Sequence, residues 1–150
     1  MVAPPPRPAV PVASRARRDY MMGMSSALTD GIRVEVRSDF RPDRSEPRQR
    51  RWLFTYTVTI RNEGSEPARL VSRRWIITDG AGQREEVEGD GVVGRQPRLE
   101  AGEAHQYTSF CVLPTSHGSM SGSYRMVRDD GASFDAEIAP FSLVVPGTLN

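Results

Sequence analysis

The sequence lacks lysine altogether and has a single cysteine, Cys111, among its 150 residues. One cysteine cannot form an internal disulfide, so we expect a protein of the reducing cytoplasm. No hydrophobic run approaches the roughly 20 residues that a membrane-spanning helix needs. The first residues also lack the apolar core of a secretory signal peptide. We therefore predict a cytoplasmic chain with no membrane association.

An excess of one charge is also missing, because 20 arginines face 19 acidic residues and the formal net charge is +1. Residues 1–24 carry four of the arginines and one aspartate, which leaves the rest of the chain slightly acidic. Nucleic-acid binding normally requires a basic surface to pair with phosphates. We therefore expect no nucleic-acid partner, and we attribute the all-arginine usage to a GC-rich genome.

The first 24 residues differ in composition from the rest. They have four prolines before residue 9 and no hydrophobic periodicity. We predict a disordered proline- and arginine-rich extension over residues 1–24 and one domain over residues 25–150. Met21, Met22 and Met24 leave open a start of translation near Met24. An arginine-rich transit peptide is a further alternative, which the prolines disfavour.

From Ala27 onward the hydrophobic pattern is that of short strands. In residues 31–39 and 51–62, apolar side chains alternate with polar ones, as in half-buried strands. Further strands are expected at 68–79, 83–89, 105–113 and 141–145, with two more inside 119–138 joined at Asp130-Gly131. No segment shows a sustained helical period. The sequence thus predicts an all-β, immunoglobulin-like antiparallel sandwich of about seven strands, with Trp75 in its core against aliphatic neighbours.

Residues 89–97, GDGVVGRQP, place Gly89, Gly91 and Gly94 at the G-x-G-x-x-G spacing of dinucleotide-binding proteins. That motif works when a helix follows and directs its amides at a pyrophosphate. Here Pro97 and the two valines disfavour a helix. A nest of backbone amides, assisted by Arg95 and Arg98, could still hold an anion. A glycine-permitted loop is the interpretation that we favour.

Two groups of residues suggest metal binding. Glu86, Glu88 and Asp90 share one face of an extended strand and could offer oxygen ligands to magnesium. A charged edge strand that discourages pairing explains them better.

His105, Cys111 and His117 match no zinc-binding spacing, and the first two lie roughly 20 Å apart on one strand. We expect no bound metal and no cofactor.

Catalytic groups are not recognisable in the sequence. A nucleophilic enzyme needs a base beside its nucleophile, and neither histidine stands in such a setting. Ser119, Ser121 and Ser123 alternate as in an ordinary strand. We expect that the protein is not an enzyme.

Several segments together resemble the ApaG family, also called CorD. They are FTYTVTIRNEG (54–64), RRWIITDG (73–80), GDGVVGRQPRLEAGE (89–103), YTS (107–109) and GSMSGSYRMVRDDGASFDAEIAPFSL (118–143). The resemblance runs from about Gly31 to the C-terminus and leaves out the first 24 residues. His105 and His117 lie outside the family pattern, and Phe110 stands where the family commonly has glycine.

The resemblance implies a fibronectin type III-like sandwich and a protein-binding role, with an indirect link to cobalt resistance and magnesium efflux. It also implies an alternative function, because the glycine motif has been proposed to bind pyrophosphate. On that alternative the chain senses a pyrophosphate-containing nucleotide at residues 89–98. The protein partner is not identified by the sequence, and exposed sheet edges allow a homodimer.

Overall fold

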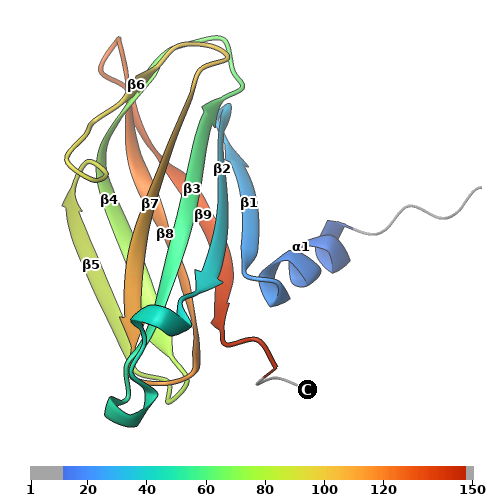
Figure 1. Cartoon of the computed structure of the whole chain (residues 1–150). Helices are drawn as coiled ribbons and strands as arrows, with labels where there is room; N and C mark the ends of the chain where they lie inside the picture. The colour runs from blue at the N-terminus through green and yellow to red at the C-terminus, as the bar shows by residue number, and fades with distance from the viewer. Residues whose placement is uncertain (1–11, 148–150) are drawn as a thin grey trace, which may run out of the picture.

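The computed structural model describes residues 12–147, which form two antiparallel sheets and one helix (Figure 1). The first sheet has the order β1-β2-β3-β7, and the second has the order β5-β4-β8-β9 with β6 paired to β4. The strands of the first sheet are β1 Met24–Thr29, β2 Ile32–Phe40, β3 Trp52–Asn62 and β7 Ala104–Leu113. Those of the second are β4 Ala68–Asp79, β5 Arg84–Asp90, β6 Arg98–Leu99, β8 His117–Arg128 and β9 Ser133–Val144. Two short 3-10 turns, η1 Pro42–Arg44 and η2 Pro47–Gln49, connect β2 to β3.

The predicted all-β antiparallel sandwich is confirmed, with nine strands in place of about seven. β1 and the two-residue β6 were not predicted. The expected separate strand at 141–145 is largely the end of β9, which runs on through Pro140. A register shift in the β8–β9 pairing between Met120 and Gly122 lies beside this proline. Such an irregularity accommodates a residue that cannot donate a backbone hydrogen bond.

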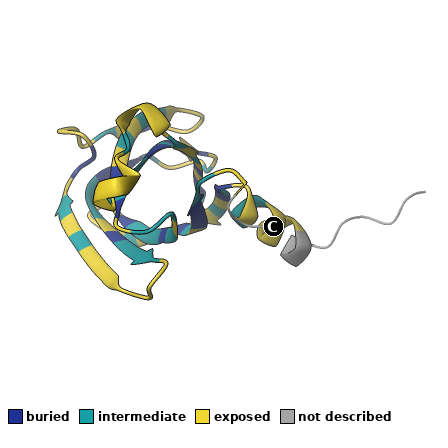
Figure 2. Ribbon diagram, turned by 60° about the horizontal axis from the view of Figure 1, so that its bottom comes forward, coloured by how far each residue is buried: buried dark blue, intermediate teal, exposed yellow. Residues whose placement is uncertain are grey.

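The core is formed by side chains that alternate inward from both sheets. Figure 2 shows the buried positions lining the inside of the ring of strands. Trp75 is 3% exposed at its centre. Its ring contacts those of Tyr56, Tyr124 and Phe141 at centroid distances of 5.2, 6.2 and 6.0 Å. The expectation of purely aliphatic neighbours is wrong, because aromatic rings in edge-to-face contact fill the space that a disulfide occupies in immunoglobulin domains.

The N-terminal region differs from the predicted extension. Helix α1 spans Val12–Met21 and contacts β1 and β9. The Ser142 hydroxyl of β9 donates a hydrogen bond to the carbonyl of Tyr20, near the end of the helix. A helix forms because the prolines stop at Pro11 and strong helix formers such as alanine and arginine follow. Residues 1–11 of the predicted extension lie outside the described residues.

The two lateral sides of the sandwich are built differently. On one side β1 and β2 contact β9 and α1 packs over the junction, and we call this the closed side. On the other side the edge strands are β5 and β7, and we call this the open side. Both sides are visible in Figure 1, with α1 at the right and β5 at the left.

Candidate functional site

The glycine segment forms the end of β5 and a tight turn. Val92 and Arg95 pair across that turn through two backbone hydrogen bonds of 2.7 and 3.0 Å. Val93 and Gly94 between them have φ of 48° and 76°, the signs typical of a type I′ turn. The following element is the short strand β6, so no helix points at these glycines. In the described chain, residues 89–98 therefore lack the strand–turn–helix geometry of a dinucleotide-binding motif.

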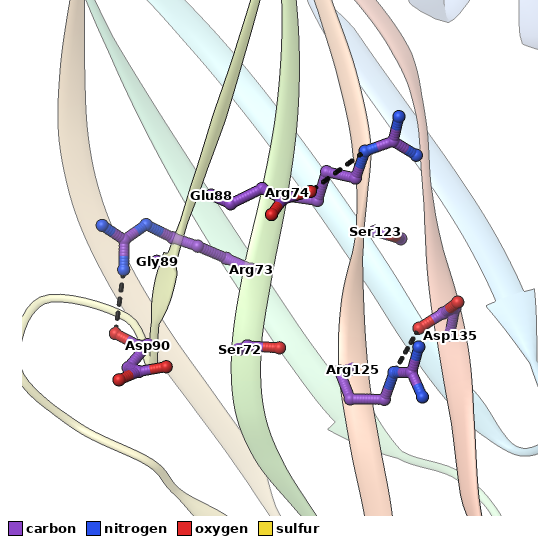
Figure 3. Close-up of a pocket in the computed structure, with 9 residues that line it drawn as sticks. All are labelled: Ser72, Arg73, Arg74, Glu88, Gly89, Asp90, Ser123, Arg125 and Asp135. Atoms are coloured by element: carbon purple, nitrogen blue, oxygen red, sulfur yellow. Dashed lines mark hydrogen bonds and ion pairs between the residues drawn. The ribbon is translucent and has the colours of Figure 1, made fainter.

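At each of the three positions, a close contact or the backbone conformation requires glycine. A Cβ on Gly89 would lie 2.7 Å from Nη2 of Arg73, whose guanidinium crosses this residue (Figure 3). A Cβ on Gly91 would collide with the carbonyl oxygen of Arg95, and Gly91 also has a φ of 60°. Gly94 needs its left-handed conformation for the turn. The motif is thus explained by the local backbone.

The amides and arginines of this segment are largely engaged within the protein. The amides of Gly91, Val92 and Arg95 donate to backbone carbonyls. Arg98 binds both carboxylate oxygens of Asp129 at 2.5 and 3.1 Å, and these bonds lower the pKa of Asp129. The Arg95 side chain is exposed at the turn. Pyrophosphate binding at residues 89–98 stays a prediction, with Arg95 as its best-placed cation.

Glu86, Glu88 and Asp90 lie on the outer face of β5, as the alternation predicted. Arg74 of β4 bridges two of them, with nitrogen–oxygen distances of 3.1 Å to Glu86 and 3.7 Å to Glu88. Figure 3 shows the ion pair between Arg74 and Glu88. The hydrogen bond from Arg74 lowers the pKa of Glu86. These carboxylates are paired with a cation of the chain itself, and within residues 12–147 no group of three metal-ligating side chains comes together.

The two histidines and the cysteine are separated as expected. His105 and Cys111 are six positions apart on β7, and His117 begins β8. Cys111 is buried, and burial raises the pKa of its thiol to about 11. The thiol is therefore protonated at neutral pH, which makes it a poor nucleophile.

The open side contains a cleft of about 540 Å³ between the two sheets. Its walls come from β4 and β5 on one side and from β7 on the other. Trp75, Val87 and Leu113 give it an apolar floor, and Phe110 stands at its rim with 61% of its surface exposed. It is also lined by charged residues, namely Arg73, Asp79, Arg84 and Glu85. The cleft thus combines an apolar floor with charged walls, and its size is typical of a binding site.

Arg73 lies at the end of the cleft next to the glycine turn. Nη1 of Arg73 donates to the carbonyls of Asp90 and Gly91, at 2.9 Å each. The hydroxyls of Tyr107 and Tyr124 form a hydrogen bond that joins β7 to β8 across the sandwich. Burial raises the pKa of both tyrosines, so both are neutral at physiological pH.

Sequence reasoning missed Arg73 as part of this side. A signal was present, because Arg73 shares its parity with the core residue Trp75 and strand alternation directs both inward. It also missed Asn62, which is fully buried at the end of β3. The Asn62 amide donates to the carbonyls of Glu66 and Leu99 at 2.8 and 3.0 Å and so anchors two loops. A polar residue that ends a strand gives no sequence signal for such a role.

The free edge of β7 borders the cleft. This strand pairs with β3 from Trp52↔Leu113 to Arg61↔Ala104 without a register shift. It has no aspartate, glutamate, lysine or arginine in its ten residues. β5, across the cleft, has five charged side chains in seven residues. The two edges of the open side therefore differ in their readiness to accept another strand.

The described residues thus define an antiparallel β-sandwich with an open cleft that has an apolar floor, and with an uncharged strand edge. In the described part of the chain no helix is long and apolar enough to cross a membrane. The ApaG domain model matches residues 42–128, and the chain belongs to the ApaG family.

Relatives and solved structures agree with this assignment. Protein ApaG from Anaeromyxobacter dehalogenans (strain 2CP-1) is 70% identical over 127 residues, which is 85% of this chain and all of the relative. Protein ApaG from Pseudomonas fluorescens (strain Pf-5) is 53% identical and covers 79% of this chain and 94% of the relative. A crystal structure of a Bordetella pertussis protein assigned as ApaA superposes with a TM-score of 0.76 at 48% identity. That match covers 78% of this chain and 95% of the other.

Proposed function

We propose that this ApaG chain is a non-catalytic binding module that holds an extended segment of another protein along β7. The observation that carries the proposal is an uncharged, unbroken strand edge with a cleft beside it that has an apolar floor. Backbone hydrogen bonds to β7 would supply affinity, and alternate side chains of the added strand would supply specificity.

The chemistry of the open side favours binding over catalysis. The thiol of Cys111 is protonated, and Tyr107 and Tyr124 are neutral and bonded to each other. Among residues 12–147 neither histidine ring has a hydrogen bond to a hydroxyl or thiol, and the Thr115 hydroxyl donates only to the backbone carbonyl of His117. On this proposal any influence on cobalt or magnesium handling is indirect and passes through the protein partner.

Site-specific photo-crosslinking in cells tests the proposal. A photoreactive phenylalanine analogue replaces Phe110 on β7, and a matched variant carries it at Leu28 on β1. Both positions are exposed, at 61% and 53%, on edge strands of the same sheet. We expect adducts with another protein at Phe110 that the Leu28 variant does not give.

The captured segment, made as a peptide, should then shift the amide resonances of β7 and leave those of β1 in place. Equal capture at both positions, or a peptide that perturbs residues away from β7, would refute the proposal.

A further inference from the structure

The sandwich has four edge strands, and three of them are protected. β1 and β9 contact each other on the closed side, where α1 also covers β1. β5 is protected by its charged side chains. β7 has no strand paired on its free edge within the described residues and no aspartate, glutamate, lysine or arginine in its own sequence. Natural sheets use charges, bulges or covering elements to prevent edge-to-edge pairing, and β7 has none of the three.

We infer that β7 pairs with β7 of a second copy of this chain, so that two first sheets join into one continuous sheet. The inference rests on the docking edge of the proposed function, and the second copy occupies that edge when no segment of another protein is bound to it. Two antiparallel copies of one strand are related by a two-fold axis, so the contact closes as a dimer and does not extend into a fibre.

The side chains of β7 suit pairing with themselves. In a two-fold pair each residue faces a residue of the same strand, so a strand whose outward charges are mostly of one sign brings like charges together. The outward residues of β7 are all neutral. They are Ala104, Gln106, Thr108, Phe110 and Val112. Like charges directly opposite each other destabilise a strand pair, and no register of two β7 strands creates one at these positions.

The same test disfavours β5. In the fully overlapping antiparallel pair of two β5 strands, Glu86 would face Glu88 of the second copy, although Arg84 would face Asp90. Self-pairing is therefore disfavoured at one edge of the open side and permitted at the other.

The edge of β7 is also held straight for pairing. Its ten residues match β3 without a bulge, whereas the β4–β8 and β8–β9 pairings both have register shifts. On the outer face the hydroxyls of Thr57 and Thr108 are 2.9 Å apart, and the Gln106 amide donates to the Thr59 hydroxyl at 2.9 Å. These cross-strand bonds fix β7 to β3 and present its free edge as a regular template.

Pairing at β7 would change the cleft. An added strand lies about 4.8 Å from β7 and directs every second side chain to the inner face of the sheet. Those inward side chains would stand at the mouth of the cleft, beside the inward residues of β7. The second copy would thus partly cover the apolar surface that the single chain leaves open.

The test compares Phe110→Lys with Leu28→Lys by light scattering and sedimentation over a wide concentration range. We expect a concentration-dependent mass of two chains for the wild type and for Leu28→Lys. For Phe110→Lys the dimer dissociation constant should rise roughly tenfold or more, because a lysine beside the two-fold axis is desolvated. Circular dichroism and thermal unfolding show whether each variant is folded. Phe110→Ser keeps the position neutral and serves as a second variant should the lysine disturb folding.

Amide hydrogen exchange gives an independent measurement. The unpaired amides of β7 should exchange more slowly as the wild-type concentration rises, and those of β5 should not. A wild type that stays monomeric at every concentration would overturn the inference. A dimer that Phe110→Lys leaves intact would overturn it as well. Neither result removes the proposed function, which fails separately when crosslinking at Phe110 captures no other protein.

Discussion

The closed and open sides of the sandwich are held by different kinds of interaction. On the closed side, buried apolar side chains of β9 pack against both sheets, and Phe141 and Leu143 are fully buried. On the open side, positive-φ turns, ion pairs and the bonds from Arg73 to two carbonyls fix the backbone around a cleft. Packing therefore stabilises the first side, while local geometry shapes the second and leaves apolar surface for a partner.

The largest expected effect compares one phenylalanine from each side. Phe141→Ala should reduce the free energy of unfolding by about 3–5 kcal/mol, because it leaves a cavity beside Trp75 and Tyr56. Phe110→Ala should change it by less than about 0.5 kcal/mol, because that ring is mostly exposed. Urea unfolding followed by tryptophan fluorescence measures both. Similar losses in the two variants would contradict the division between the sides.

A smaller effect is expected at the glycine turn of the open side. Gly91→Ala should cost about 2 kcal/mol of unfolding free energy, since its φ is positive and a Cβ meets the Arg95 carbonyl oxygen. Gly94→Ala is the matched control. It has a positive φ but open space around a Cβ, so about 1 kcal/mol is expected.

Pyrophosphate titration by calorimetry accompanies these glycine variants. Pyrophosphate binding in the wild type that Gly94→Ala or Arg95→Ala abolishes with the fold intact would show that the motif holds an anion. Wild-type protein that binds no pyrophosphate would leave the turn as the reason for the glycines.

The smallest effect concerns pH. The Cys111 thiol has a pKa of about 11 in the folded chain against an ordinary value of 9.0. The folded state therefore keeps its proton at a pH where the unfolded state releases it. Stability should fall as the pH rises above 9, by about 1 kcal/mol from this group at pH 10. Denaturation at pH 8 and pH 10 measures the loss, and Cys111→Val should show a smaller one. An equal loss in both proteins would assign the effect to the buried tyrosines.

Much of the fold can be predicted from the sequence, because the alternation of apolar and polar residues along a strand shows which face each residue occupies. β2 and β3 are predicted well, since their apolar residues recur at every second position. β1 was missed because Met24–Thr29 consists mainly of serine, alanine and other residues with modest strand preference. Helix α1 was not predicted, because the prolines that precede it gave residues 1–24 as a whole the composition of a disordered segment.

The site is less predictable for a different reason. The lack of a helix after the glycine segment could be predicted, because Pro97 and the two valines disfavour one. The cleft could not, because its existence depends on how far β5 and β7 lie apart, and no local pattern encodes the spacing of two sheets. The neighbours of Trp75 were mispredicted for the same reason: alternation gives the inward face and not the residues across the core.

The closed side also constrains when the protein can fold. It joins β1, which starts at Met24, to β9, which ends at Val144, so its contacts link segments more than 100 residues apart. Such non-local contacts slow folding, because a long loop must close before they form. During synthesis β1 must wait for the last strand to leave the ribosome. The nascent chain accordingly has unpaired edges at both ends of its first sheet until β9 has been synthesised, and it acquires its protected side only then.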